Sequence, residues 1–460
     1  MHSAESVAEL AYLAAGVVGC GFVEASLRRG LDHDVAFIGV DAGSTDPGPR
    51  YLAGEQGIFG RASYVRDLRG LLLAARSADI PLLIGSAAGS GNNWSVDYFA
   101  TLIQEIAKSE GLTFTLAKIY ADQEPEAILS YLDAGRVRPL AAAPPYDADA
   151  VRRSQRIVAV MGVEPFQAAL EAGADVVVAG RATDTAIYAA IPLARGIDPA
   201  VAWHAAKIAE CGTSAAEPRG RMDVLLLTLG SDSFTVEPLR DEIRCTPMSV
   251  AAVQLHEVAN PIEMIEPGWI TDLSDVRYTP ASDRRVHAAG AVARQVENTN
   301  KLEGVEFAGY QSMFLCGVRD PTIIESLDAW MNTLQSDIRT RCAEVLGVAA
   351  MENCRITVRV YGRDGVLGDR EPLRNDLPHE VALVVDVVAS EDAATRTIIE
   401  IVEYAYQHGK SPRWRGHGTL AYPFSQRIFH IGPVYAFNVH HVVCEPDPHA
   451  LFATRFEVVG

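Results

Sequence analysis

Short apolar runs alternate with amphipathic stretches over the first 215 residues of the chain. The stretches 64–78 and 94–111 repeat their apolar residues at the three- to four-residue spacing of a helix. Continuous Val/Ile/Leu runs separated by helices are typical of a parallel sheet that is covered on both faces. We therefore predict an α/β domain over residues 1–215, with strands at residues 35–40, 81–86, 114–120, 156–162 and 174–180.

The pattern changes after residue 215. Residues 216–305 have the irregular strands and loops of a connecting region. Over residues 306–460, apolar runs and helical stretches follow in the order strand, helix, strand, strand, helix, strand. This βαββαβ order predicts an α+β ferredoxin-like domain. A segment rich in Gly, Asp and Pro at residues 362–378 predicts a long hairpin between its two middle strands.

The polar residues of interest follow the predicted strands. The four segments "DAGSTDPG" (41–48), "GSAAGSGNN" (85–93), "ADQE" (121–124) and "GRATD" (180–184) each come directly after a strand. In parallel sheets, ligands bind beyond the carboxyl ends of the strands. We therefore predict a site at this edge, with Asp41, Asp46 and Asp184 as candidate acid–base groups. The candidate substrate-binding residues are Ser44, Thr45, Gly85, Ser86, Asn92, Asn93, Gln123, Arg181 and Thr183.

Each of these loops also has a purely structural interpretation. Residues 85–93 could bind an anion at the start of the next helix, or form a turn capped by Asn93 or Ser95. Arg181 could hold a substrate carboxylate or pair with Asp184 to fix the turn. The two acids of "DAGSTDPG" could move protons or cap turns. The sequence leaves these alternatives open.

A dinucleotide site is a weaker alternative. Gly16, Gly19 and Gly21 are spaced G-x-x-G-x-G, and Asp41 follows twenty residues later, where an acid can bind a ribose. The residues before Gly16 are richer in Ala than in β-branched residues, and no Tyr-x-x-x-Lys follows. We expect no organic cofactor.

Charge and cysteine content narrow the partners. The net charge of −19, without a basic cluster, argues against nucleic acid. The seven scattered cysteines lack C-x-x-C, which favours a reducing cytoplasm and argues against a cysteine zinc site. Adjacent His440 and His441 would point to opposite faces of a strand, so we predict no metal. No stretch has the ~20 apolar residues of a membrane span, so we expect no membrane partner.

Several strings are more specific than composition. They are "GVVGCGF" (16–22), "IGVDAGSTDPGP" (38–49), "PLLIGSAAGSGN" (81–92), "DVVVAGRATDTAIYAA" (175–190), "GVRDP" (317–321), "RVYGRDGVLG" (359–368), "YPFS" (422–425) and "GPVYAFNVHHV" (432–442). Together they resemble the acyclic terpene utilisation family, many of whose members are labelled as domains of unknown function. The resemblance implies an α/β N-terminal domain, a pathway that degrades citronellol-like terpenes through acyl-CoA intermediates and, in some relatives, a small companion protein. It carries no assigned catalytic residue.

The residues and the resemblance favour an enzyme that acts on a small carboxylic acid or its CoA ester. The chemistry would be that of a lyase, hydro-lyase or isomerase, because these reactions need an anion clamp beside an acid and a base. One alternative is a non-catalytic subunit that depends on a companion, and another is an NAD(P)-dependent oxidoreductase. We expect a homo-oligomer, because split βαββαβ domains often pair through their sheets.

Overall fold

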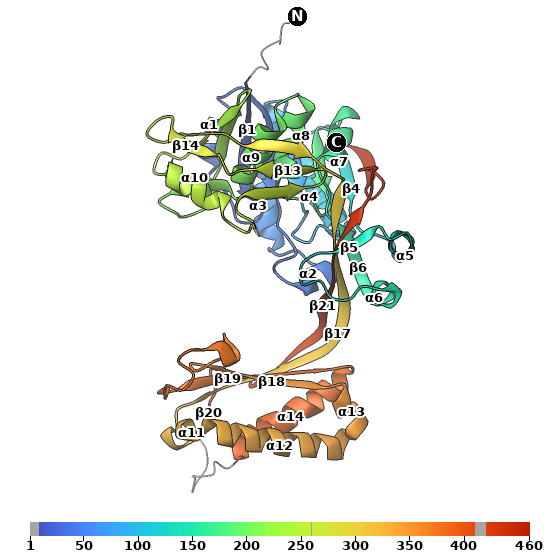
Figure 1. Ribbon diagram of the computed structural model, residues 1–460, viewed down its shortest axis with the longest axis vertical. Helices are drawn as coiled ribbons and strands as arrows, with labels where there is room; N and C mark the ends of the chain where they lie inside the picture. Colours follow the sequence, from blue (N-terminus) through green and yellow to red (C-terminus); the bar gives the residue numbers. More distant parts are fainter. Residues whose placement is uncertain (1–8, 259, 410–419) are drawn as a thin grey trace, which may run out of the picture. The chain divides into compact units, whose positions relative to one another are not determined.

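The computed structural model describes residues 9–258, 260–409 and 420–460. Contacts within the chain divide it into two compact units (Figure 1). The larger unit comprises Met1–Glu306 and Phe437–Gly460, and the smaller unit comprises Phe307–Ala436. Strands β17 (Thr299–Val318) and β21 (Ile428–Cys444) each begin in one unit and end in the other. Among the described residues, no helix is both long enough and apolar enough to cross a bilayer.

The larger unit is built on a mixed sheet with a parallel centre. Within the described residues, its ten strands follow the order β14-β15-β10-β9-β1-β2-β3-β7-β4-β22. The five strands from β1 to β4 in this order are parallel, and the flanking strands are antiparallel. The predicted parallel sheet is therefore present as the middle of a larger sheet. The strands are β1 (Leu10–Val17), β2 (Val35–Asp41), β3 (Leu82–Gly85), β4 (Phe114–Tyr120), β7 (Val176–Ala179), β9 (Leu225–Leu229), β10 (Ser233–Pro238), β14 (Arg277–Pro280), β15 (Val286–Ala289) and β22 (Ala453–Val459).

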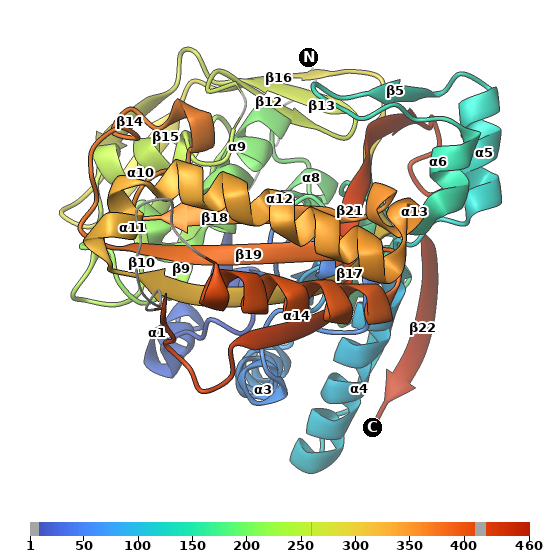
Figure 2. The same cartoon turned by 90° about the horizontal axis from the view of Figure 1, so that it is seen from below.

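Helices cover both faces of the parallel strands. Figure 2 shows α1 (Glu24–Gly30), α3 (Arg61–Ser77) and α4 (Asn93–Glu110) on one side of the sheet. Figure 2 shows α8 (Ala186–Ala194) and α9 (Pro199–Glu210) on the opposite side. Helix α8 contacts both α9 and α7 (Glu164–Glu171). The two sets lie on opposite faces because the chain moves in one direction from β1 to β4 and then returns to β7. Apolar side chains of α3 and α4 pack on Ile38, Ile84 and Val178 of the strands.

Two expectations about strands were wrong. The Ala-rich run before Gly16 is strand β1, at the centre of the sheet, where small side chains suit a strand buried on both faces. The run at 156–162 contributes β6 (Ser154–Ala159), which pairs antiparallel with β17 instead of joining the parallel sheet. A continuous apolar run shows that a strand is buried, but it does not show which neighbour it takes.

Residues 216–305 complete the larger unit. They contribute β9, β10, β14 and β15 to its main sheet and form a three-stranded sheet, β12-β13-β16. The remaining elements of this unit are α2 (Pro49–Ala53), α5 (Pro125–Asp133), β5 (Val137–Pro139), α6 (Ala148–Arg153), a 3₁₀ turn (Gly212–Ala215), β8 (Ala216–Glu217), β11 (Arg244–Cys245), α10 (Pro247–Gln254), β12 (Glu263–Glu266), β13 (Trp269–Asp272) and β16 (Val292–Gln295).

The smaller unit is a sheet covered on one face by two long helices. Its strand order is β18-β19-β17-β21, and the β17–β19 and β18–β19 pairs are antiparallel. Figure 2 shows α12 and α14 side by side across these strands, where Trp330, Ile398 and Val385 are buried. The elements are α11 (Pro321–Glu325), α12 (Leu327–Leu346), α13 (Val348–Glu352), β18 (Arg355–Tyr361), a 3₁₀ turn (Gly368–Arg370), β19 (Val381–Ala389), α14 (Asp392–His408) and β20 (Leu420–Ala421).

Candidate functional site

The strand order brings the four predicted loops to one edge of the sheet. Strands β2, β3, β7 and β4 are consecutive neighbours, so the segments 41–48, 85–93, 121–124 and 180–184 all leave the sheet at its carboxyl edge. The structure then sorts the candidate residues into those that meet in one polar network and those that hold the loops in place.

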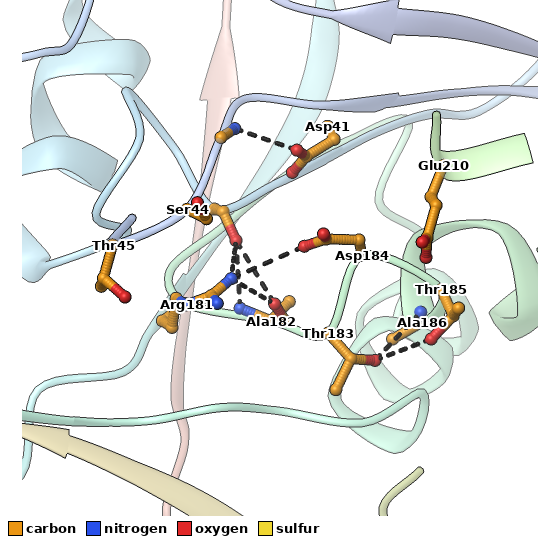
Figure 3. A network of polar contacts seen from close by, with 12 residues as sticks. Asp41, Ser44, Thr45, Arg181, Ala182, Thr183, Asp184, Thr185, Ala186 and Glu210 are labelled. Atoms are coloured by element: carbon orange, nitrogen blue, oxygen red, sulfur yellow. Dashed lines mark hydrogen bonds and ion pairs between the residues drawn. The ribbon is translucent and has the colours of Figure 1, made fainter. Parts of the chain in front are cut away.

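Arg181 is the centre of the network. It follows β7 and is 9% exposed. Its Nε donates to Oε2 of Glu303 at 2.9 Å, and its Nη1 donates to Oγ of Ser86 at 3.1 Å. Nη1 also lies 3.6 Å from Oδ1 of Asp184, so the predicted Arg181–Asp184 pair is present (Figure 3). Within the described part of the chain, Nη2 makes no hydrogen bond, which leaves one edge of the guanidinium for a ligand.

Glu303 is a partner that the sequence did not reveal. It lies in β17, is 4% exposed, and accepts hydrogen bonds from Lys301 at 2.7 Å and from the hydroxyl of Thr45 at 3.1 Å. Burial alone would raise the pKa of Glu303, but Arg181 and Lys301 lower it to about 2. The "Lys-x-Glu" spacing places Lys301 and Glu303 on one face of a strand. This spacing is the local feature of the sequence that could have indicated Glu303 as a functional residue.

Asp41 is the last residue of β2 and is 6% exposed. Its Oδ2 accepts the backbone N–H of Gly43 at 3.1 Å, whereas Oδ1 is buried without a hydrogen-bond partner among the described residues. Burial, and then the nearby carboxylate of Asp184, raise the pKa of Asp41 well above its usual range, against a smaller opposite effect of Arg181. The surroundings of Asp41 therefore favour its protonated form.

Asp184 lies in the loop after β7 and faces Asp41 and Arg181 (Figure 3). Its side chain is 35% exposed, so solvent reaches it even though protein atoms surround it closely. Burial raises the pKa of Asp184, and Arg181 and Lys207 partly oppose this effect. The hydroxyl of the neighbouring Thr183 accepts the backbone N–H of Ala186, the first residue of α8, at 3.2 Å.

A second layer of acids, which no local sequence pattern indicates, lies behind Asp184. Glu210, the last residue of α9, forms an ion pair with Lys207 one turn earlier, and Lys207 also donates to the carbonyl of His256. Burial raises the pKa of Glu210 to about 8. Burial also raises the pKa of Glu266, in β12, to about 7, while the hydroxyls of Thr185 and Thr183 lower it. Figure 3 shows the Glu210 side chain directed toward the loop that carries Asp184 and Thr185.

The loop after β3 is held in an unusual backbone conformation beside Arg181. Ser86 and Ala88 have φ angles of 47° and 52°, in the left-handed region that disfavours residues other than glycine. Gly91 packs so closely that a Cβ there would lie 2.4 Å from the backbone nitrogen of Arg181. Such strain persists only where the surroundings impose it, and it is concentrated at functional sites. Here it directs the Ser86 hydroxyl to Arg181.

Other candidates stabilise the loops. Asn92 caps α4 through Ser95 N–H and donates to carbonyls of the α2 segment. The side chain of Asn93 accepts the backbone N–H of Asp122, and Gln123 donates to the carbonyl of Leu451. Gly85 leaves no room for a side chain, because a Cβ would lie 2.4 Å from Ile187. These contacts engage the polar groups that could otherwise bind a substrate.

Ser44 and Asp46 form an exposed turn. The hydroxyl of Ser44 donates to Oδ2 of Asp46 at 2.8 Å and accepts the backbone N–H of Asp46 at 3.2 Å. The side chain of Asp46 thus has a local partner, and the structure does not bring it to Arg181. Thr45, between them, is buried and turns the other way to reach Glu303.

The glycine loop after β1 is already filled. Both Gly19 and Gly21 donate their N–H groups to Oδ2 of Asp67, at 2.7 and 3.0 Å. The ring of Phe59 covers Gly19, where a Cβ would lie 2.3 Å from it. A pyrophosphate binds such a loop through free N–H groups, and a buried carboxylate in their place repels it. Two of the N–H groups that a dinucleotide would need are therefore occupied, although the strand expected before this loop is present as β1.

The described residues contain no group of three or more His, Cys, Asp or Glu side chains arranged to hold a metal ion. The side chain of His441 is engaged within the protein, because its Nδ1 accepts the backbone N–H of His440 and its ring stacks on Tyr146.

A cavity of about 660 Å³ lies in the smaller unit, outside the four loops. It is lined by residues 315–319, 361–362, 379–382 and 421–423.

Comparison with families of known proteins gives one match. The model of the "acyclic terpene utilisation family protein AtuA" matches residues 84–218 and 237–430, which include the loops after β3, β4 and β7. No curated protein and no solved structure gave a significant match. The matched segments cover most of the chain and confirm the resemblance that its motifs indicated. The chain belongs to the acyclic terpene utilisation family, whose name connects it with the use of acyclic terpenes.

Proposed function

We propose that this protein is an enzyme that moves a proton on a small carboxylic acid or its acyl thioester. The reaction class is that of a lyase, hydro-lyase or isomerase, and the site is the carboxyl edge of β2, β3 and β7. The observation that carries the proposal is the pair of carboxyl groups formed by the buried Asp41 and the partly exposed Asp184, set beside Arg181.

Two interacting carboxyl groups in different environments suit acid–base chemistry. Asp41 is the more deeply buried and holds its proton more strongly, whereas the Asp184 side chain is partly exposed. When two acids interact and their environments push their pKa values apart, one serves as proton donor and the other as acceptor. In the proposed reaction, Asp184 takes a proton from the carbon next to the carbonyl group. Asp41 shares its proton with the carbonyl oxygen while negative charge develops there, and the proton held by Asp184 then goes to the departing hydroxyl group or to the rearranged carbon.

Arg181 supplies the orienting group. Glu303 and Ser86 fix the guanidinium in one position, so Nη2 presents a directed donor to a substrate oxygen. A donor held in place before the substrate arrives stabilises developing negative charge on that oxygen without reorganisation. An enolate-like intermediate would place its negative charge on this oxygen.

The experiment is hydrogen exchange at carbon, which needs no knowledge of the product. Octanoyl-CoA and 3-hydroxyoctanoyl-CoA are incubated with the protein in D₂O, and deuterium at the carbon next to the carbonyl is followed by NMR. The wild-type chain should catalyse exchange, and Asp41→Asn and Asp184→Asn should each suppress it.

Asp46→Asn is the matched control, because it removes the same type of acid from the same loop but outside the network. Exchange by this variant should equal that of the wild type. Equal exchange by the Asp41 and Asp184 variants, or no exchange with either thioester, would overturn the proposal.

A further inference from the structure

Acidic side chains outnumber basic ones in the polar network around Arg181. This imbalance determines which charge a ligand can bring to the site. Glu303 is shared by Arg181 and Lys301, and Glu210 pairs with Lys207. Asp184 shares Arg181 with Glu303, and Asp41 and Glu266 add two further acids. With five acids and three bases, two acids are in excess, and burial favours their protonated forms.

The bases are also engaged by the protein. Lys301 donates to Oε1 of Glu303, and Lys207 donates to Glu210 and to the carbonyl of His256. Arg181 uses Nε for Glu303 and Nη1 for Ser86 and the carbonyl of Ala182. Among the described residues of this network, no base lies beyond ion-pair distance of an acid, so no uncompensated positive charge awaits a carboxylate.

The other titratable groups around the network do not supply that charge. Burial and then Lys301 lower the pKa of His440, which favours its neutral ring. Burial raises the pKa values of the Cys20 and Cys211 thiols and of the Tyr188 hydroxyl, so these groups are neutral as well. Glu257, which also faces Asp184, adds a further acid.

The network nevertheless contains polar groups that lack a partner. Oδ1 of Asp41 and the hydroxyl of Tyr188 are buried without a hydrogen bond within the described residues, and Asp41 raises the pKa of Tyr188 after burial. Both residues are more than nine-tenths buried. Protonated carboxyl and phenol groups are hydrogen-bond donors, and a neutral carbonyl oxygen accepts from them without adding a charge. Buried donors of this kind normally have partners.

We propose that the reacting end of the substrate is a neutral carbonyl, as in a thioester, and not a free carboxylate. This inference rests on the proposed function, because it concerns the same site. A carboxylate would add a negative charge to a buried network whose acids already outnumber its bases, whereas a thioester carbonyl would receive hydrogen bonds from Asp41 and from Nη2 of Arg181. Burial makes the difference in affinity between the carboxylate and the thioester large, because buried charges are weakly screened by solvent and salt.

The test compares two ligands with the same chain. Octanoate and octanoyl-N-acetylcysteamine, its uncharged thioester, are titrated into the protein by calorimetry at pH 7. The thioester should bind at least ~10-fold more tightly. In Glu303→Gln, which removes one negative charge and releases Nε of Arg181, octanoate should bind at least ~10-fold more tightly than to the wild type, with little change for the thioester.

Asp184→Asn provides a second variant, because it removes an excess acid without breaking the Arg181–Glu303 pair, and it should shift the preference in the same direction. If the wild type binds octanoate as tightly as the thioester, or binds neither, the inference is wrong. It is also wrong if neither Glu303→Gln nor Asp184→Asn changes the ratio of the octanoate and thioester affinities. Preferential thioester binding without exchange at carbon would instead overturn the proposed function and leave the inference standing.

Discussion

Asp41 and Asp67 are both buried acids near the carboxyl ends of neighbouring strands, but their surroundings differ. Asp67, on α3, accepts N–H groups from Gly19 and Gly21 through Oδ2 and the guanidinium of Arg66 through Oδ1. Asp41 accepts one N–H group through Oδ2, and its Oδ1 has no partner among the described residues. Asp67 is thus surrounded by donors, whereas Asp41 faces another acid, Asp184.

The difference separates an acid that stabilises the fold from one that is available for chemistry. Donors around a carboxylate stabilise its charged form and fix its position. A carboxyl group with an unpaired oxygen, opposite a second carboxyl group, retains a proton that it can transfer. Composition does not distinguish the two acids, because each lies near glycines and hydroxyl residues. Their hydrogen-bond partners do.

The largest expected effect is that of Asp41→Asn on catalysis. The amide is a neutral isostere of the protonated acid but has no proton to transfer. The rate of deuterium exchange should fall at least ~100-fold. The free energy of unfolding at pH 7 should change by less than about 1 kcal/mol, because the amide matches the neutral form that burial of the carboxyl group favours. Chemical denaturation measures the second quantity, and a collapse of stability would assign Asp41 to the fold.

Asp67→Asn should show the opposite pattern. The amide has only one acceptor oxygen, which can serve either the glycine N–H groups or Arg66. Its N–H₂ group would face the remaining donors, and the negative charge beside Arg66 would be lost. The free energy of unfolding should fall by about 2 kcal/mol, the usual magnitude for hydrogen bonds to a charged group. Urea denaturation at pH 7 measures this loss. An unchanged midpoint would show that the glycine loop does not depend on the carboxylate.

Glu266→Gln tests the second layer of acids through the pH dependence of stability. The pKa of Glu266 is raised by burial to about 7, above its unfolded value, so the folded state holds the proton more tightly. Stability from this group is complete below the unfolded pKa and is lost as pH rises toward about 7.

The Gln variant should therefore match the wild type near pH 4 and exceed its free energy of unfolding by up to about 3 kcal/mol at pH 8. Denaturation curves at the two pH values measure the difference. A constant difference across this range would show that Glu266 does not titrate as its burial implies.

The smallest effects are expected in the exposed turn. Ser44→Ala removes the hydrogen bond to Asp46 at the surface, where solvent replaces the lost partner. The free energy of unfolding should change by less than about 0.5 kcal/mol. Exchange at carbon should be unaffected. A strong loss of exchange would place this turn in the site. It would also weaken the contrast between Asp41, in the network, and Asp46, in the exposed turn.

The sequence indicates the edge of the sheet but not the complete network. Parallel strands place their following loops on one edge, so Asp41, Arg181 and Asp184 could be grouped from the apolar runs alone. Asn92 and Asn93 were grouped with them, because helix caps and binding loops use the same small polar residues.

The missed residues are distant in sequence. Glu303 meets Arg181 across more than a hundred residues, through a strand that pairs with β6, and no local pattern predicts such pairing. Glu210 ends an otherwise ordinary helix, and only the folded chain shows that Asp184 lies near it. The burial that perturbs these acids is a tertiary property.

The central claim is that Asp41 is protonated at neutral pH. Infrared spectroscopy of the folded protein at pH 7 detects the C=O stretch of protonated carboxyl groups, and comparison with Asp41→Asn isolates one residue. Asp46→Asn serves as the matched control. We predict that the protonated-carboxyl band of the wild type loses intensity in Asp41→Asn and keeps it in Asp46→Asn. Equal spectra for the wild type and Asp41→Asn in this region would show that Asp41 is ionised and would contradict the account.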